Sequence, residues 1–390
     1  MEKKLDQKTI LTFVSLIAFF ILLIVLEHVI DPRGSMSMLL TVLKKSAAYS
    51  LVAVSMNLLN GFTGLFSLGQ AGFMLIGAYI YAIFTIPLED RDSVYRYYDC
   101  AVNVSFPEIF GNVLGGPGML AGVLFALILA GIASAGVAFL VGLPVLRLKS
   151  DYLAIATLGF AEIIRSVFQW GKLGPITNGS NPLRNYVRLN AFKLEIGDIT
   201  IGLTTFVPAL LAALCIGVIV MLVNSSYGRA FKAIREDEIA AEAMGINLYI
   251  HKQLSFCISS FFAGFGGGIL AMFMGTVMAN NFRAAMTYEI LLIVVLGGIG
   301  SVSGSVLGTM LFVFAQEWWL RGLDSGSFLG ITAPVVFRNG FRLVVFSVII
   351  MTVVLFFRRG IMGDKEIPYM LNRLKEWILA RTKKAGGEND

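Results

Sequence analysis

The sequence predicts an all-α fold, a polytopic bundle of transmembrane helices, on three observations. Of its 390 residues, 57% are hydrophobic and only 14% are charged, whereas soluble domains carry about 25% charged residues. Apolar runs close to the ~20 residues that cross a bilayer recur along the chain. Glycine is abundant, with 41 residues, as expected where membrane helices pack closely. The net charge of +6 therefore indicates anionic lipid and membrane topology, and we expect no nucleic-acid partner.

The apolar runs predict the helices in order. The first run, Ile10 to Leu26, follows Lys3, Lys4 and Lys8. Because it is long and no small-x-small cleavage site follows, we interpret it as a retained span. The others occupy residues 36–60, 68–86, 119–143, 152–170, 200–223, 253–277, 287–300, 303–320 and 340–357. We expect about ten spans, and in the short adjoining pair 287–300 and 303–320 one segment could be re-entrant.

Three regions follow from these runs. Residues 1–35 form a signal-anchor-like span, residues 36–363 the main transmembrane domain, and residues 364–390 a cytoplasmic tail. Apolar residues of the tail recur at helical spacing beside basic ones: Ile367, Met370, Leu371, Leu374 and Ile378. This pattern predicts an amphipathic helix on the inner membrane face, with a solvated tail helix as an equal alternative.

Lysine and arginine placement predicts the orientation, with both termini in the cytoplasm. An even number of spans then gives the cytoplasm these basic residues: Arg147, Lys149, Arg229, Lys232, Arg235, Lys252, Arg358 and Arg359. The outer segment 87–118 is mainly acidic. Lys44 and Lys45 fit this scheme badly, and we expect them to mark an interfacial piece from which their stems extend to the headgroups.

Small residues predict where helices pack. They recur at every fourth position in two places: Gly122, Ala126, Ala130, Ser134, Ala138 and Gly142, and again Gly300, Gly304 and Gly308. Such stripes let helix backbones approach closely, either within the chain or against a second subunit.

The stretch YGRAFKAIREDEIAAEAMGIN, residues 227–247, is charged in an otherwise apolar chain. Its charges belong in water, and we expect a helix there. Phe231, Ile234, Ala241 and Met244 are spaced to share one face, and Gly245 is suited to end the helix. A solvated linker helix is one interpretation, and a helix that docks into a partner's groove is the other.

Two apolar segments are interrupted by glycine and serine: GFTGLFSLGQAG (61–72) and GGIGSVSGSVLG (297–308). Broken segments in corresponding halves of a transporter indicate a midplane site, because freed backbone groups can meet a solute's charged ends. The candidate pathway residues are Ser67, Gly69, Gln70, Gly298, Gly300 and Ser303. Close helix packing with a hydrogen-bonded glutamine is the alternative interpretation.

Glu162 and Arg165 are spaced to pair on one face of a helix within an apolar run. Such an intramembrane pair serves either as a structural ion pair or as part of a proton relay, and the first is favoured. We expect no catalytic residue and no metal site. The three cysteines form no CxxC pair, the two histidines are far apart, and no HExxH motif is present.

Several stretches resemble known transport proteins. Within 227–247, Ala240, Ala241 and Gly245 match the cytoplasmic coupling loop of ABC importer permeases. Five segments, 57–79, 152–167, 177–183, 294–308 and 356–363, resemble the branched-chain amino acid permease family of the LivM type, and the likeness extends over about 46 to 363. The sequence departs from that pattern at Gln70, where a histidine is common, and at Asn178 and Pro182, which interrupt a glycine-rich loop.

The resemblance implies a non-enzymatic permease subunit of an importer for branched-chain or related amino acids in the bacterial inner membrane. It also implies a second permease as hetero-dimer partner, two cytoplasmic ATPases and an extracytoplasmic binding protein. ATP and Mg would bind the ATPases, since this chain has no GxxxxGK[ST] phosphate loop. The residues expected to couple to the ATPases are Arg229, Arg235, Glu236, Asp237, Ala240, Ala241, Glu242 and Gly245. The alternative is a self-sufficient ion-coupled transporter or channel in which Glu162 and Arg165 are central.

Overall fold

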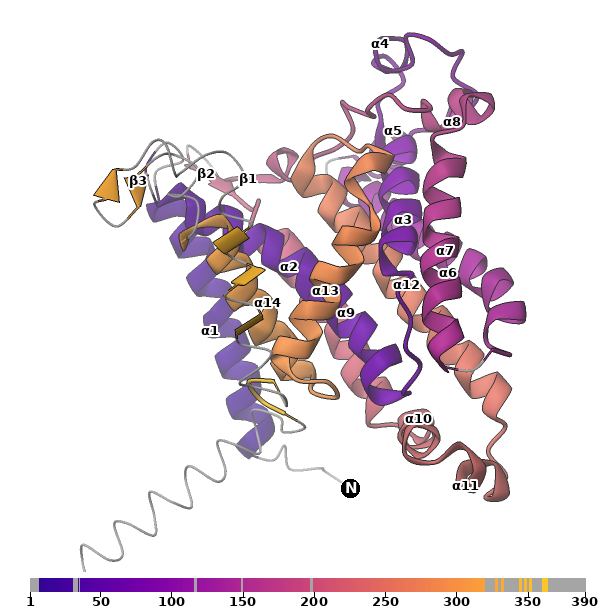
Figure 1. Cartoon of the computed structure of the whole chain (residues 1–390). Helices are drawn as coiled ribbons and strands as arrows, with labels where there is room; N and C mark the ends of the chain where they lie inside the picture. Colours follow the sequence, from indigo (N-terminus) through magenta and orange to yellow (C-terminus); the bar gives the residue numbers. More distant parts are fainter. Residues whose placement is uncertain are drawn as a thin grey trace, which may run out of the picture.

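The described structure is predominantly helical, as the sequence predicts (Figure 1). It is a computed structural model that describes residues 7–30, 34, 36–115, 118–148, 150–196 and 199–319 and short pieces between 327 and 363. The long helices are α1 (Gln7–Val29), α2 (Ser37–Asn57), α3 (Gln70–Thr85), α6 (Gly118–Val145), α7 (Ser150–Phe168), α9 (Phe206–Val223), α12 (Leu248–Met274), α13 (Ala284–Gly297) and α14 (Val302–Glu317).

Shorter elements join these helices. They are the π-helical turn η1 (Leu58–Phe62), α4 (Arg91–Val94), α5 (Phe106–Leu114), η2 (Gly171–Leu173), α8 (Gly174–Thr177), η3 (Leu189–Ala191), α10 (Ser226–Glu236), α11 (Glu238–Ala243) and η4 (Ala279–Asn281). Two short antiparallel hairpins, β1 (Lys193–Ile196) with β2 (Ile199–Gly202) and β3 (Ser327–Phe328) with β4 (Ile331–Thr332), add strands that the sequence did not predict.

The predicted count of about ten spans is not confirmed. Among the described residues, five helices are long and apolar enough to cross a membrane, or six if α7 and the bent η2–α8 piece form one span. That bend of 60° makes α7–α8 the broken or re-entrant candidate. The pair expected to contain it, α13 and α14, forms a hairpin of two short helices, and a re-entrant segment there stays a prediction. Most of the predicted run 340–357, the tail 364–390 and Lys149, Arg358 and Arg359 lie outside the described residues.

Helix α12 is the centre of the bundle, packed against α2, α3 and α6. Of the five candidate spans it is the most enclosed, since 78% of its most apolar 18-residue stretch is buried, against 22% for α9. Helices α6, α7 and α9 turn apolar side chains outward, among them Leu140, Ile155 and Met221. A surface of this kind suits lipid, which costs such side chains nothing.

The predicted stripe on α6 is confirmed as a packing face within the chain, whereas of the second stripe Gly300 lies in the turn before α14 and only Gly304 and Gly308 pack from that helix. The six small residues from Gly122 to Gly142 are all buried on α6. Gly122 faces the Phe106 backbone of α5, and Ser134 faces Gly264 of α12. In the α13–α14 hairpin, Gly304 and Gly308 lie against the Gly297 backbone.

Helix α1 is joined to α9 by a carboxylate. Glu27 Oε1 accepts hydrogen bonds from Thr204 N (2.9 Å) and Thr204 Oγ1 (2.5 Å), and Glu27 Oε2 accepts from Thr205 N (2.9 Å). These amides precede the first turn of α9 and have no acceptor within that helix. Glu27 therefore caps a helix far from it in sequence, and a negative charge there also suits the helix dipole.

The expectation that Lys45 extends outward to headgroups is wrong. Its Nζ lies 2.6 Å from Glu317 Oε1 at the end of α14, 3.4 Å from Gln316 Oε1, and 5.3 Å from the Tyr49 ring centroid. An apolar surrounding penalises a lone charge, so pairing across helices is the more stable arrangement. The partner is 272 residues away, and no local pattern indicates it.

Candidate functional site

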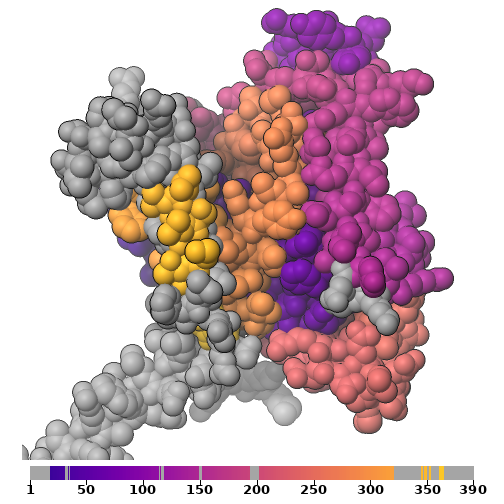
Figure 2. Space-filling view, viewed as in Figure 1, coloured from indigo at the N-terminus to yellow at the C-terminus, as the bar shows by residue number. Residues whose placement is uncertain are grey.

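The charged stretch 227–247 protrudes at one end of the molecule as two short helices, α10 and α11 (Figures 1 and 2). The sequence predicted one helix, and the break falls at Asp237, whose backbone is extended (φ −158°, ψ 113°). Asp237 Oδ1 accepts from Ile239 N at 2.8 Å and Ala240 N at 3.0 Å. Asp237 thus starts a new helix as an N-cap, which its residue type favours over a helix interior.

Gly245 ends α11, as the sequence predicted. Its φ is +84°, and Ile246 N donates to Ala241 O across the turn at 3.1 Å. Asn247 follows as the N-cap of α12, with its Oδ1 accepting from Ile250 N at 3.1 Å. Only this left-handed turn separates α11 from the central helix, so the orientation of α11 depends on Gly245.

Only part of the predicted apolar face packs against the rest of the chain. Phe231, Ile234 and Ala241 are buried, whereas Met244 is 83% exposed and therefore does not share their surroundings. Ile239 is also 81% exposed. These two apolar side chains sit on a short helix with Glu238 and Glu242, both exposed, and a Glu238–Lys252 ion pair of 2.6 Å ties α11 to α12.

The residues expected to contact ATPases fall into three groups. Arg229, Glu236, Asp237, Ala240, Glu242 and Gly245 are exposed, and Ala241 is buried. Arg235 is exposed as a whole residue, but its Nη1 turns back to the bundle and donates to Gly61 O at 2.7 Å. The same helix places Lys232 Nζ 5.6 Å from the Phe62 ring centroid.

The first interrupted segment contains a true break in the helix. After η1 the chain is non-helical over 63–69 and α3 starts at Gln70. Side chains satisfy the freed backbone: Ser67 N donates to Asn60 Oδ1 (3.1 Å), Leu68 N to Thr157 Oγ1 (2.9 Å) and Ala71 N to Thr287 Oγ1 (3.1 Å). Three separate elements therefore hold this break.

The second interrupted segment is a tight turn between α13 and α14, over 298–301. Gly298 and Gly300 have φ of +119° and +91°. Asn57, at the end of α2, accepts from Gly300 N through Oδ1 (2.8 Å) and donates through Nδ2 to Ser301 O (2.9 Å) and Ser305 Oγ (2.8 Å). The Asn57 side-chain amide thus joins the end of α2 to the second break.

The candidate pathway residues are mostly enclosed. Ser67 and Gln70 are each 2% exposed, and Gln70 Nε2 donates to Ser259 Oγ at 3.1 Å and Ser55 Oγ at 3.4 Å. Gly69 is buried and Ser303 partly buried. The structure therefore brings both breaks together around a polar cluster of α2, α3, α12 and α14. Sequence reasoning missed Asn57 and Asn60, although amides in an apolar run are a usable signal.

Glu162 and Arg165 form an ion pair, with Arg165 Nε 2.7 Å from Glu162 Oε2. The pair also reaches other elements: Ala284 N donates to Glu162 Oε1 at 3.3 Å, and Arg165 Nη1 donates to Asn280 Oδ1 at 3.3 Å. It ties α7 to the start of α13. Both carboxylate oxygens of Glu162 are thereby engaged by neighbouring groups.

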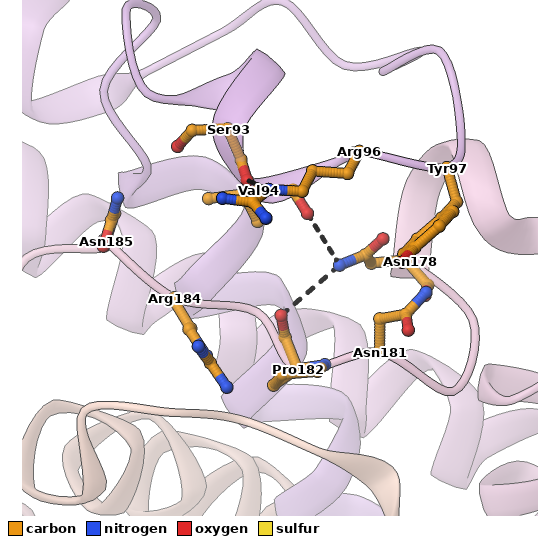
Figure 3. A pocket seen from close by; sticks show the side chains of 9 residues that line it. All are labelled: Ser93, Val94, Arg96, Tyr97, Asn178, Asn181, Pro182, Arg184 and Asn185. Atoms are coloured by element: carbon orange, nitrogen blue, oxygen red, sulfur yellow. Dashed lines mark hydrogen bonds between the residues drawn. The ribbon is translucent and has the colours of Figure 1, made fainter.

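A polar pocket lies at the end opposite α10 and α11, where segments 87–110 and 177–185 meet (Figure 3). Its volume is about 350 Å³, and it is lined by Ser93, Val94, Arg96, Tyr97, Asn178, Asn181, Pro182, Arg184 and Asn185. Asn178 joins the two segments, donating through Nδ2 to Val94 O (3.1 Å) and Pro182 O (3.3 Å). Tyr95 O–H donates to Ile176 O at 2.8 Å, and burial raises its pKa, so this donor stays protonated.

Comparison with known proteins agrees with this architecture. The family model described as branched-chain amino acid transport system / permease component matches residues 38–357. The chain belongs to the branched-chain amino acid permease family. The resemblance found in the sequence is thereby confirmed, and the five stretches that carried it lie within or at the edge of the matched region.

Three relatives each match two thirds or more of this chain. The high-affinity branched-chain amino acid transport system permease protein LivM of Salmonella typhimurium is 32% identical over 334 residues, which cover 80% of this chain and 70% of that protein. LivM of Escherichia coli is 31% identical over the same shares. The guanosine ABC transporter permease protein NupQ of Bacillus subtilis is 24% identical over 262 residues, 67% of this chain and 75% of that protein. No solved structure matches the chain.

Proposed function

We propose that this chain is the transmembrane permease subunit of an ATP-driven importer of branched-chain or related amino acids. The observation that carries the proposal is α11, a six-residue helix with exposed Ile239 and Met244 among carboxylates, standing outside a bundle of the permease family. Exposed apolar side chains rimmed by charge are typical of protein interaction sites. A linker helix that only crossed water would gain nothing from them.

The proposed partners follow from the two ends of the molecule. Two ATPase subunits bind ATP and Mg and receive α10 and α11, while a binding protein delivers the solute to the opposite end, where the polar pocket lies. A second permease subunit completes the pathway as a hetero-dimer. In this arrangement the protein spans the bacterial inner membrane with both termini in the cytoplasm, which agrees with the basic residues at the α10–α11 end.

Transport follows from movement of α10 and α11. Closure of the ATPase dimer on ATP would displace α11, and rigid helices would convert that displacement into re-packing of the bundle and alternating access. The proposed pathway is lined near the two breaks, by Ser67, Gly69 and Gln70 on one side and Gly298, Gly300 and Ser303 on the other. Backbone groups at such breaks can bind the charged ends of an amino acid.

Reconstitution tests the proposal. The complex isolated through a tag on this chain from its native membranes should contain an ATPase and, in proteoliposomes with its binding protein, should accumulate radiolabelled leucine only with ATP. Uptake by this chain alone, driven by an ion gradient, would refute the proposal in favour of a self-sufficient transporter.

Gly245 offers a sharper test of coupling. A Cβ there meets nothing within 4 Å, so Gly245→Val should not clash, but its left-handed backbone would cost about 1–2 kcal/mol with a side chain. The turn should relax and re-aim α11, so ATP hydrolysis should continue while leucine uptake per ATP falls. Gly217→Val is the matched control, because Gly217 is equally open but lies within α9. Unchanged coupling in Gly245→Val would contradict the assignment.

A further inference from the structure

The inference concerns Arg235, which links the exposed helices to the interior. Its side chain is 32% exposed, and its guanidinium donates to Gly61 O at 2.7 Å, 174 residues away in sequence. A second partner, Glu236 Oε1 at 3.6 Å, lies on the solvent side, and the Glu236 side chain is 75% exposed. An exposed pair of that length contributes little. The contact that fixes the direction of Arg235 is therefore the one to Gly61.

The chain around Gly61 is shaped to receive this side chain. Gly64 has φ of +76°, and a Cβ there would lie 3.1 Å from Arg235 Cγ and 3.2 Å from Arg235 Cα. Phe62, next to Gly61, meets the Lys232 ammonium from the same face of α10. Beneath them, Phe231 and Ile234 are buried. Helix α10 is thus fixed to the η1 region by packing and by a charge-assisted hydrogen bond.

Gly61 belongs to a π-helical turn, which is locally wider than an α-helix. Thr63 N bonds Leu58 O at 3.2 Å, and Thr63 Oγ1 also donates to Leu58 O at 3.1 Å. π-Helical turns are rare, and this one ends the helix that α2 begins, directly before the non-helical residues 63–69. Arg235 therefore binds η1, the turn that leads from α2 into the first break.

The second break is directly behind this turn. A Cβ on Gly61 would overlap the Asn57 amide oxygen and lie 2.7 Å from Gly300 N. Asn57 in turn bridges to Gly300, Ser301 and Ser305. A continuous series of contacts thus runs from Arg235 through Gly61 and Asn57 to the turn between α13 and α14.

We propose that Arg235 is a positioning residue that transmits the movement of α10 and α11 to both breaks through Gly61 and Asn57. This inference rests on the proposed function and deepens it, because it assigns Arg235 to the inside of the chain and not to the ATPase surface. When α10 moves, the guanidinium pulls on the π turn, and the Asn57 bridge carries the displacement to Gly300. Rigid packing makes such a chain of contacts respond as a unit.

The test compares three variants in the native complex reconstituted with its binding protein. In Arg235→Ala, the ATPase should still co-isolate and hydrolyse ATP, while radiolabelled leucine uptake per ATP should fall by about 5-fold or more, the lower end of coupling between linked sites. Arg235→Lys should restore part of the ratio, because an ammonium can still donate to a carbonyl. Arg147→Ala is the control, since Arg147 is also an exposed arginine but follows the end of α6, outside α10 and α11.

A fourth variant reaches the same contact from the other side. Gly64→Ala should displace the Arg235 stem and lower uptake per ATP in the same direction, with Arg235 itself intact. Wild-type uptake per ATP in Arg235→Ala would overturn the inference while leaving the proposed function standing. Loss of the ATPase from Arg235→Ala but not from Arg147→Ala would also overturn it, because Arg235 would then be a docking residue. Absence of ATP-driven uptake in the wild-type complex would instead refute the proposed function.

Discussion

The two breaks in the bundle satisfy the hydrogen bonds of their non-helical backbone in different ways. The break at 63–69 is longer and is held by separate side chains from η1, α7 and α13, namely Asn60, Thr157 and Thr287. The break at 298–301 is shorter, uses two left-handed glycines, and receives its bridge to α2 from Asn57 alone among the described residues. Inside a membrane every freed backbone group needs a protein partner.

The difference shows at which break the structure tolerates the loss of a hydrogen-bonding side chain. At the first break, removing one side chain leaves the remaining ones in place. At the second, one amide serves Gly300, Ser301 and Ser305 together, so its loss affects three groups at once. The second break also rests against residues 361–362, whose amides donate to Leu296 O and Gly297 O, but Asn57 is its bridge to α2.

Asn57→Ala should have the largest effect. It leaves the partly buried Gly300 N–H without its acceptor and removes two further bonds of the buried Asn57 amide, so we expect a destabilisation of about 3 kcal/mol. Thermal unfolding of the purified protein in detergent measures it. Asn60→Ala, at the first break, should cost clearly less, because Asn60 is only partly buried and Thr157 and Thr287 remain. Equal losses in the two variants would remove the contrast between the breaks.

Gly298→Ala should be next in size. Its backbone (φ 119°, ψ 121°) is one that side chains rarely adopt, and a Cβ there would lie 2.5 Å from Gly363 O. We expect a cost of about 2 kcal/mol, in the range for such strained residues. Gly159→Ala is the matched control in α7, since a Cβ there meets nothing within 4 Å and alanine favours a helix. A neutral Gly298→Ala would show that the second turn is adaptable.

Thr157→Val should have the smallest effect. It keeps the shape of the side chain but removes the acceptor of Leu68 N, so about 1 kcal/mol is expected from one lost hydrogen bond. Thr85→Val provides the comparison, because the Thr85 hydroxyl only donates to Tyr81 O in its own helix. The same melting measurement applies. A loss from Thr157→Val as large as that from Asn57→Ala would mean that the first break also depends on one contact.

Much of the fold was predictable because helix-forming apolar runs and small-residue stripes are local patterns. The nine long helices fall within or close to predicted runs, and the stripe from Gly122 to Gly142 packs as expected. The interruptions at 61–72 and 297–308 were predictable for the same reason, since glycine and serine weaken a helix locally. Length alone did not decide which of these helices span the membrane.

What the sequence did not reveal depends on contacts between distant residues. Nothing near Arg235 indicates that it turns toward Gly61, and nothing near Lys45 indicates Glu317. Asp237 illustrates a second limit, because an acidic residue among helix formers suits both a helix and a cap. Asp237 acts as an N-cap in the structure, so the segment forms two helices where the sequence predicted one. Membership of the permease family was recoverable because several motifs occur in order.

The Glu27 cap has a consequence for how the protein is made. Its acceptor oxygens serve Thr204 and Thr205, and Glu27 and Thr204 are separated by 177 residues. At a synthesis rate of roughly 5–20 residues per second, this carboxylate leaves the ribosome about 9–35 s before its partners. During that interval Glu27 needs another solvation shell, from water or from the insertion machinery. Assembly of α1 onto the bundle is thus a late event, completed only when α9 arrives.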